Sequence, residues 1–283
     1  MINYNRCSEV KIEQVYEAFN IGFSDYIVKF NMGLEDFIKR FFGPEGNSLE
    51  NSFIAMDGDK PIGLVLGGIK EYQGIKTIRC GTLTVAPDYR GQGISYKLFD
   101  LYKEEGIKNN CKQLFLEVIV GNDRAIKFYE KNGFYKVYNM WYYGLSDIED
   151  IKSYDLGNIV LKESNMDTLN RIFKEKVDYH INWQNDIDFI RGLENNIIYG
   201  AYEEDKVVSL ICITPMGRVN FLWTDKEFRN KGLAMSLIKE VYLKNQIKKV
   251  SLCFPNNSLA YGFSLRNGFK KEDLSQYEMY YIL

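Results

Sequence analysis

The chain repeats one pattern of residues, and this repeat limits the folds that it can adopt. The stretch Arg90 to Ser95 has the form Arg-x-x-Gly-x-small, and Arg229 to Ala234 has the same form 139 positions later. An Asn-Gly-Phe triplet at 132–134 recurs at 267–269, 135 positions later. Features that recur at nearly one period are typical of a duplicated structural unit. The sequence therefore predicts two copies of one fold.

The endings of the two copies and the length of the chain support this division. Met140-Trp141-Tyr142 lies near the end of the first copy, and Met279-Tyr280-Tyr281 near the end of the second. A chain of 283 residues has reached the size at which a single core gives way to two domains. Residues 146–155 are polar and acidic and are interpreted as a linker. We predict domains at 1–146 and 156–283.

The spacing of apolar residues predicts alternating strands and helices in both copies. In the first copy we expect strands at 1–7, 52–56, 62–69, 75–85, 113–120, 134–137 and 140–145. We expect helices there from about Glu9, behind a Ser8 cap, at 34–42, at 94–107 and up to Lys131. In the second copy we expect strands at 157–163, 197–202, 207–213 and 219–224, and a helix at 166–177. This order predicts an α/β fold with a mixed, α+β-type sheet in each copy.

The loop between the strand at 75–85 and the helix at 94–107 predicts an anion site. The first backbone N–H groups of a helix have no partner within the helix, and the helix dipole favours negative charge at the same place. Gly91 and Gly93 would let a phosphate approach the backbone. Tyr96 stands where a dinucleotide-binding loop needs glycine, and no Gly-Lys-Ser/Thr of a phosphate-binding P-loop follows.

The Arg-x-x-Gly-x-small loop resembles the pyrophosphate loop of the GNAT acyltransferases, with Ser95 where that family usually has Gly or Ala. The resemblance implies tandem GNAT acyl-CoA N-acyltransferase domains, a strand that separates from its neighbour at this point, and coenzyme A bound along the strand and loop. The cofactor-binding residues that it implies are Leu83, Thr84, Val85, Arg90, Gly91, Gln92, Gly93, Ile94, Ser95, Asn122, Ala125 and Phe128.

A second motif carries the same resemblance. Residues 116–134 match the family pattern Leu-x-Val-x-x-x-Asn-x-x-Ala-x-x-x-Tyr-x-x-x-Gly-Phe at every position. By resemblance Tyr129 lies near the sulfur as general acid, and a tyrosine suits that role because it holds its proton at neutral pH. Glu117 matches the carboxylate that ribosomal-protein N-terminal acetyltransferases use as general base. The residues alone also allow Tyr129 to pack on the sheet, and Glu117 to face solvent or orient the amine.

The second copy lacks these groups. If Asn257 is aligned with Asn122, Ser264 replaces Tyr129, and either Leu252 or Cys253 stands at the position of Glu117. We interpret this domain as degenerate. In the first copy, aromatic residues are candidates for lining an acceptor pocket: Phe23, Tyr26, Trp141, Tyr142 and Tyr143.

Composition excludes several other classes of function. The net charge of −2, without a basic tract, argues against nucleic acid or a membrane surface as partner. The five cysteines are scattered and never form Cys-x-x-Cys, which favours reduced thiols in a cytoplasmic protein over disulfides or a metal site. No signal peptide and no membrane span are expected. A Ser-His or Cys-His acyl-enzyme would have to use His180, the one histidine, which lies far in sequence from the loop.

We therefore predict an acetyl-CoA-dependent N-acetyltransferase, catalytic in its first domain, in which a primary amine attacks the thioester directly in a ternary complex. No metal is expected. The acceptor is a small-molecule or peptide amine, and the sequence does not choose between them. A monomer or weak homodimer is expected. The alternatives are a non-catalytic acyl-CoA-binding or interaction protein, and an acyltransferase that uses another acyl-CoA donor.

Overall fold

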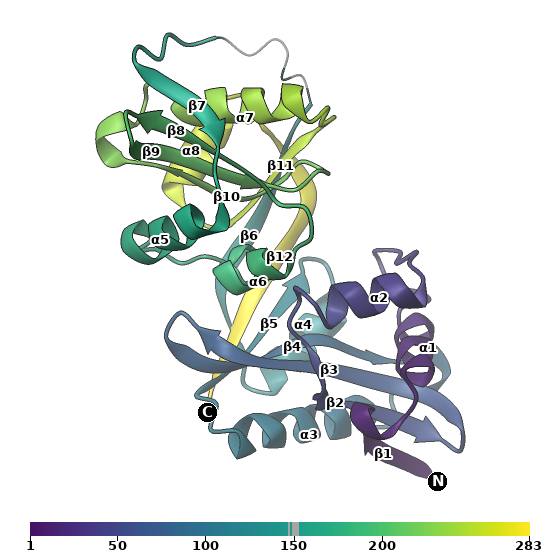
Figure 1. Cartoon of the computed structure of the whole chain (residues 1–283). Helices are drawn as coiled ribbons and strands as arrows, with labels where there is room; N and C mark the ends of the chain where they lie inside the picture. Colours follow the sequence, from purple (N-terminus) through teal and green to yellow (C-terminus); the bar gives the residue numbers. More distant parts are fainter. Residues whose placement is uncertain (147, 149–152) are drawn as a thin grey trace. The chain divides into compact units, whose positions relative to one another are not determined.

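The computed structural model describes residues 1–146, 148 and 153–283 (Figure 1). Most of the linker predicted at 146–155 lies outside the described residues. The chain forms two compact units, one made of Met1–Tyr138 with Gln276–Leu283 and the other of Asn139–Ser275. Both have mixed sheets with helices, so the α/β class predicted from the sequence is confirmed.

The first unit contains the elements that its apolar spacing predicted. In chain order they are β1 (Ile2–Arg6), α1 (Ile12–Gly22), α2 (Leu34–Phe41), β2 (Ser48–Asp57), β3 (Lys60–Tyr72), β4 (Ile75–Val85), α3 (Ile94–Lys108), β5 (Gln113–Ile119), α4 (Asp123–Lys131) and the start of β6 (Tyr135–Leu145). Strands β1 to β4 are paired in sequence order and antiparallel, whereas β4 and β5 are parallel. The predicted Ser8 cap is wrong, because α1 begins at Ile12 with Lys11 as its N-cap and a short 3₁₀ turn occupies Cys7–Glu9.

The strand beside β5 comes from the far end of the chain. Residues Gln276 to Ile282 of β12 (Lys270–Ile282) pair antiparallel with β5, which places the C-terminal strand in the first unit. Met140–Leu145 of β6, assigned from sequence to the first domain, pair instead with β11 (Val250–Pro255) in the second unit. The sequence-based assignment of the strand at 140–145 to the first domain is therefore wrong, because this strand belongs to the second unit. Both segments contain a Met followed by two aromatic residues, and a local pattern does not specify which neighbour a strand pairs with.

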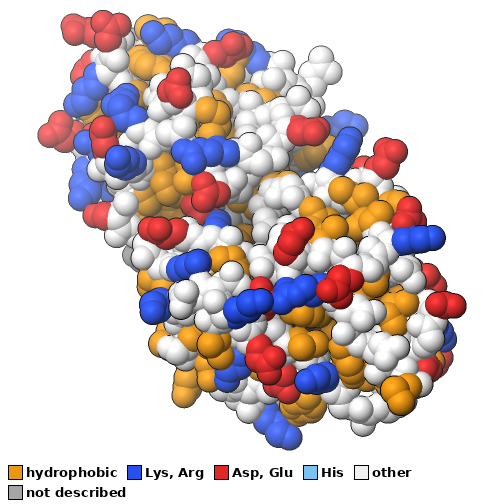
Figure 2. All heavy atoms as spheres, turned by 60° about the horizontal axis from the view of Figure 1, so that its bottom comes forward, with side chains coloured by type: hydrophobic (Ala, Val, Ile, Leu, Met, Phe, Trp, Pro, Cys, Tyr) orange, Lys and Arg blue, Asp and Glu red, His pale blue; other side chains and the backbone are white. Residues whose placement is uncertain are grey.

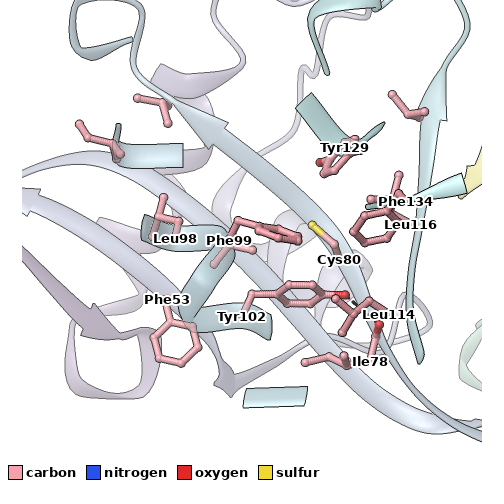
Figure 3. Close-up of a cluster of buried hydrophobic side chains, with 14 of the residues drawn as sticks. Phe53, Ile78, Cys80, Leu98, Phe99, Tyr102, Leu114, Leu116, Tyr129 and Phe134 are labelled. Carbon is pink, nitrogen blue, oxygen red and sulfur yellow. Dashed lines mark hydrogen bonds between the residues drawn. The ribbon is translucent and has the colours of Figure 1, made fainter. Parts of the chain in front are cut away.

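Each face of the first sheet is covered by a different pair of helices. Along β2, Phe53 and Ala55 pack with α3 and α4, whereas Ile54 and Met56 pack with α1 and α2. This alternation follows from the two-residue repeat of a strand. The α3–α4 side contains the larger cluster, which includes Leu98, Phe99, Tyr102, Tyr129 and Phe134 (Figure 3).

The second unit repeats this arrangement. It contains β7 (Ile159–Glu163), α5 (Met166–Lys176), α6 (Ile187–Gly192), β8 (Ile197–Glu203), β9 (Lys206–Ile213), β10 (Arg218–Thr224), α7 (Leu233–Lys244), β11, α8 (Ser258–Arg266) and the start of β12. Helix α7 packs on one core cluster, and α5 and α6 border another. The short helix α6 is absent from the sequence prediction. Trp141 and Tyr143, proposed above for an acceptor pocket, pack on Phe254 and Tyr261 in this unit.

Candidate functional site

The parallel strands β4 and β5 separate in the middle of the first sheet. They are paired only as far as Cys80 opposite Leu116, although both strands continue beyond that point with their outer neighbours. A one-residue bulge at Gly81 occurs at the same level of β4, and a bulge bends the strand that contains it. This confirms the separation that the family resemblance implied. It opens the sheet at the place where the candidate residues converge.

The loop that follows β4 is open at its glycines. Gly91 and Gly93 have φ of +77° and +83°, a left-handed conformation that L side chains rarely adopt. A Cβ at either position would have no atom within 4 Å, so space lies beside the backbone at both. Gly93 is the N-cap of α3 and brings no side-chain cap. The loop therefore leaves the first N–H groups of α3 available to an anion.

The side chain of Arg90 holds this loop in place. Its guanidinium donates to both carboxylate oxygens of Asp25, at 2.5 and 2.7 Å, and to the carbonyl oxygens of Gly22 and Val85. The guanidinium also lowers the pKa of the Asp25 carboxyl to about 2. The arginine of the motif thus ties the end of α1 to the loop. An anion in the loop would meet backbone N–H groups rather than this guanidinium.

The other predicted cofactor residues lie around the same opening. Thr84 and Val85 are buried on β4, and Leu83 is half-buried opposite Val65 of β3. Gln92 is exposed. Ile94 and Ser95 lie in the first turn of α3, where Ile94 is buried and Ser95 is half-buried.

Helix α4 begins at the other side of the opening. Asn122 is its N-cap, and the side-chain oxygen accepts a hydrogen bond from the N–H of Ala125. The Asn122 side chain is also close enough to Tyr26, from the connection after α1, to oppose the rise in the pKa of Tyr26 that burial causes. Phe128 packs against Tyr96 at a centroid distance of 5.0 Å. The N-cap position thus explains the asparagine, because its side chain accepts from a backbone N–H of the first turn, and its neighbours link α4 to α1 and α3.

Tyr129 lies directly beside the point where the strands separate. Its side chain lies near Cys80, the last β4 residue paired with β5 (Figure 3). Burial raises the pKa of the Tyr129 hydroxyl well above its usual value, and Cys80 raises it further. The hydroxyl is therefore protonated at neutral pH. Tyr129 is packed in the core and also lies beside the opening, so the packing interpretation and the functional one describe the same residue.

Glu117 is the first β5 residue beyond the last pair with β4. Its side chain is 5% exposed, and its carboxylate accepts hydrogen bonds from Nε and Nη2 of Arg79 at 3.0 and 2.6 Å. Arg79 also forms an ion pair with Glu45, at 2.7 Å. Burial raises the pKa of the Glu117 carboxyl, and Glu45 and Glu278 raise it further, while Arg79 opposes them. Glu117 does not lie on a solvent face.

The two candidate catalytic residues approach the opening from opposite faces of the sheet. Leu116 and Val118, the neighbours of Glu117, belong to the α3–α4 cluster, as does Tyr129. Because strand residues alternate, Glu117 points to the other face. Sequence reasoning missed the partners of both residues: Arg79, Glu45, Glu278 and Cys80. The one available signal was Arg79, a charge within an apolar strand, which implies a buried partner.

The second unit keeps the opening but not the side chains. Strands β10 and β11 are paired only as far as Val219 opposite Leu252, and a bulge occurs at Asn220. The residue beyond the last pair is Cys253, so the structure selects it over Leu252 as the counterpart of Glu117. Ser264, the counterpart of Tyr129, is buried and donates to the carbonyl oxygen of Ala260.

The second glycine loop has the same backbone but is covered. Asn230 and Gly232 have φ of +62° and +86°, close to those of Gly91 and Gly93. A Cβ on Gly232 would lie 2.2 to 2.7 Å from ring atoms of Tyr154. An aromatic ring thus fills, at Gly232, the space that is open in the first unit.

Other site classes receive no support from the described residues. Within them no group of three His, Cys, Asp or Glu side chains could hold a metal ion, and no helix is long and apolar enough to cross a membrane. The five cysteines are buried, and none of them forms a disulfide bond. On the face shown in Figure 2, basic and acidic side chains are interspersed.

Comparison with known proteins gives matches in both copies. The model of the acetyltransferase (GNAT) family matches residues 12–134 and 161–269. N-alpha-acetyltransferase 30 of Schizosaccharomyces pombe is 35% identical over 103 residues, which are 34% of this chain and 65% of that protein. N-alpha-acetyltransferase 30 of Saccharomyces cerevisiae is 28% identical over 109 residues, 36% of this chain and 62% of that protein. The matched region thus spans less than two-thirds of either curated relative.

Among solved structures, a tandem GNAT protein from the clavulanic acid biosynthesis pathway has a TM-score of 0.73 at 12% identity, over 100% of this chain and 98% of that chain. A GCN5-related N-acetyltransferase from Sphaerobacter thermophilus has a TM-score of 0.70 at 12% identity, over 100% and 95% of the two chains. At this identity the likeness concerns the fold alone.

Proposed function

The chain belongs to the acetyltransferase (GNAT) family, and from this premise we propose that its first unit transfers an acetyl group from acetyl-CoA to a primary amine. One observation carries the proposal. Glu117 is the first β5 residue after the strands separate, and Tyr129 belongs to the same buried cluster as Cys80, the last β4 residue before they do. A proton acceptor and a proton donor thus flank one opening in the sheet.

The residues around the opening fit a coenzyme A pyrophosphate and pantetheine. The open space beside Gly91 and Gly93 would admit the pyrophosphate to the N–H groups at the start of α3. From Thr82 to Val85, β4 is paired with β3 but no longer with β5, so its backbone groups on the β5 side would be available to the pantetheine. Bound acetyl-CoA supplies the acetyl group as an activated thioester.

The chain's own residues would manage the protons of the transfer. Glu117 accepts a proton from the ammonium form of the acceptor, so that the amine nitrogen has a free electron pair. The nitrogen then bonds to the acetyl carbon as the carbon–sulfur bond breaks, and the hydroxyl of Tyr129 gives its proton to the departing sulfur. The second proton lost by the nitrogen restores the tyrosine. The sum is an amide, a free thiol and one proton released to water.

We assign this chemistry to the first unit alone. Cys253 and Ser264 replace the carboxylate and the phenol in the second unit, and Tyr154 covers Gly232. A buried thiol and a serine bonded to its own helix supply neither proton acceptor nor donor at neutral pH. The second unit is proposed as a structural partner of the first.

The proposed acceptor is an α-amino group. The two curated relatives are named N-alpha-acetyltransferases, and they share 28% to 35% identity with part of this chain. Burial raises the pKa of the Glu117 carboxyl, which suits it to take a proton from a cationic acceptor. Small α-amino compounds and peptides with free N-termini both satisfy this chemistry.

The test is thiol release from acetyl-CoA in the presence of an amine panel that includes short peptides. Tyr129→Phe is expected to lower kcat by about 10²–10⁴ with little change in the Kd of acetyl-CoA. Ser264→Ala, at the matching position of the second unit, should leave kcat unchanged. Wild-type turnover in Tyr129→Phe, or an equal loss in Ser264→Ala, would contradict the assignment. Binding of acetyl-CoA without thiol release for every amine would contradict the proposed activity.

A further inference from the structure

The chain leaves α1 in a turn that reaches both sides of the opening. Residues Phe23 to Tyr26 form this turn, which we call the strap, and the N–H of Tyr26 donates to the carbonyl oxygen of Phe23 at 3.0 Å. Just before the strap, α1 lies against β4 beyond the point of separation, because a Cβ on Gly22 would be 2.2 to 2.8 Å from the side chain of Thr84. The strap therefore starts next to the strand edge that is proposed for the pantetheine.

Asp25 attaches the strap to the loop after β4. Its carboxylate accepts two hydrogen bonds from the guanidinium of Arg90, at 2.5 and 2.7 Å. The same guanidinium donates to the carbonyl oxygens of Gly22 and Val85, at 3.2 and 3.0 Å. A pair of parallel hydrogen bonds between arginine and carboxylate fixes orientation as well as distance. One arginine thus joins the strap to the end of α1 and the end of β4.

Tyr26 brings the strap to the other side of the opening. Burial raises the pKa of the Tyr26 phenol, and the side chain of Asn122, the N-cap of α4, is close enough to oppose this rise. Tyr26 in turn helps to raise the pKa of Tyr129, so the two phenols are neighbours. The ring of Tyr26 also packs on Phe23 and Phe30, with centroids 4.9 and 6.3 Å away. The strap thus extends from the loop after β4 to the start of α4.

The strap lies on the face of the sheet to which Glu117 points. Val85 packs on the α3–α4 side, so the neighbouring Thr84 points to the α1 side, where it meets Gly22. Glu117 also points away from the α3–α4 side. An acceptor that reaches Glu117 would therefore enter past the strap. A thioester in the opening would have the strap between it and solvent on this face.

The ion pair that holds the strap is weak enough to be broken and remade. The side chain of Asp25 is 53% exposed and that of Arg90 is 23% exposed. Ion pairs that are partly in solvent add little stability. Ser24 within the strap and Ile27 after it are also exposed. A segment held in this way can open and close while the sheet beneath it stays folded.

We propose that the strap closes the opening around the cofactor and keeps water from the thioester, and that Asp25 is the positioning residue that holds it closed through Arg90. This inference rests on the proposed function, because it concerns the same site and the same cofactor. Water that reached the acetyl carbon would break the carbon–sulfur bond and give acetate, the free thiol and a proton. Closing a site over a reactive group prevents such side reactions. The closed strap also slows the departure of the pantetheine.

The second copy offers a matched control. Asp178-Tyr179 follows α5 as Asp25-Tyr26 follows α1, and Arg229 occupies the position of Arg90 in its own loop. Asp178 is exposed. Asp178→Asn therefore makes the same chemical change in the unit to which we assign no catalysis.

The experiment first measures how fast coenzyme A leaves, without chemistry. Protein loaded with etheno-coenzyme A, a fluorescent analogue, is mixed with excess unlabelled coenzyme A, and dissociation is followed by fluorescence. Asp25→Asn should dissociate about threefold to fivefold faster than wild type, the effect of losing one partly exposed ion pair. Asp25→Glu, which keeps the charge, should stay within about twofold of wild type. Asp178→Asn should leave the rate unchanged.

The second measurement is thiol release from acetyl-CoA in the absence of any amine. Hydrolysis by Asp25→Asn should be about threefold to fivefold faster than hydrolysis by wild type, because the strap is open for more of the time. Asp178→Asn should again match wild type. A residue that only supported the fold would alter neither the rate of dissociation nor the rate of hydrolysis in this selective way.

Each outcome decides the proposal. Failure of either rate to rise in Asp25→Asn would overturn it, and so would slower dissociation, which a guanidinium freed to bind the pyrophosphate would cause. Equal rises in Asp178→Asn would overturn it as well. If Asp25→Asn no longer binds coenzyme A, Asp25→Glu decides, because a loss there too would contradict a role for the charge. A protein that shows both rises yet acetylates no amine in the panel would refute only the proposed function.

Discussion

Replacing Arg79 by Met tests whether the buried ion cluster governs the stability of the first unit. The guanidinium makes two hydrogen bonds to Glu117 and ion-pairs with Glu45, and all three side chains are 5% to 6% exposed. Methionine fills a similar volume but removes the charge. Removing one partner of a buried ion pair costs about 3–5 kcal/mol, because the other charge is left uncompensated. We expect a loss of that size at neutral pH.

The loss should depend on pH in a defined direction. The pKa of Glu117 is already raised by burial, and removing Arg79 raises it further. A carboxyl with a raised folded-state pKa favours the folded state below its unfolded pKa, and this advantage is lost as pH rises through the folded value. In Arg79→Met the destabilisation should therefore be largest at about pH 8 and fall to about 1–3 kcal/mol, the cost of lost neutral hydrogen bonds, below the ordinary glutamate pKa.

Urea unfolding followed by far-UV circular dichroism measures this effect. All three tryptophans, Trp141, Trp183 and Trp223, lie within 139–275, so their fluorescence follows the second unit in the same samples. Arg40→Met is the matched control, because Arg40 is half-exposed and its contact with Glu45 is long, at 3.8 Å. This variant should lose at most about 1 kcal/mol of unfolding free energy. A loss in Arg79→Met that is no larger than this, or one that does not change with pH, would refute the reasoning.

Two further predictions concern the glycine loops and the thiols. Ser95→Glu puts a carboxylate in the first turn of α3, where it suits the helix dipole but repels a pyrophosphate. Calorimetry should therefore find acetyl-CoA binding weakened at least about tenfold. Ala234→Glu, at the matching position of α7, should leave acetyl-CoA binding unchanged. Loss of binding in Ala234→Glu would show that the second unit handles the cofactor. Burial raises the pKa of the Cys80 and Cys212 thiols to about 12, so Ellman's reagent at mildly alkaline pH should react with less than one thiol per native chain and with all five in denaturant. Fast reaction of native thiols would contradict the burial.

Local sequence patterns predicted much of the fold and the positions of the candidate groups. The strand at 75–85 and the helix starting at Ile94 were predicted with nearly the bounds that the structure gives, because period-2 and period-3.6 patterns bury different faces. The glycines of the loop need a left-handed backbone, a requirement that is local and visible in sequence. The roles proposed for Glu117 and Tyr129 came from the resemblance to a family and stay predictions.

The sequence alone could not give the partners of those residues. Arg79 lies 34 positions from Glu45 and 38 from Glu117, and nothing near it in sequence specifies a buried ion cluster. Similarly, Arg90 fits a cofactor motif, yet its guanidinium is held by Asp25, 65 positions away. The choice between Leu252 and Cys253 as counterpart of Glu117 depended on where β10 and β11 stop pairing.

The sequence by itself determined that the chain is a duplicated α/β protein with two glycine loops, since these features arise from short-range spacing and backbone conformation. Only the tertiary structure decided which strand completes each sheet, that Tyr154 fills the space at Gly232, and that Glu278 lies opposite Glu117. Strand pairs and buried ion pairs form between residues that are distant along the chain. The free energies of these interactions depend on burial, which exists only once the chain has folded.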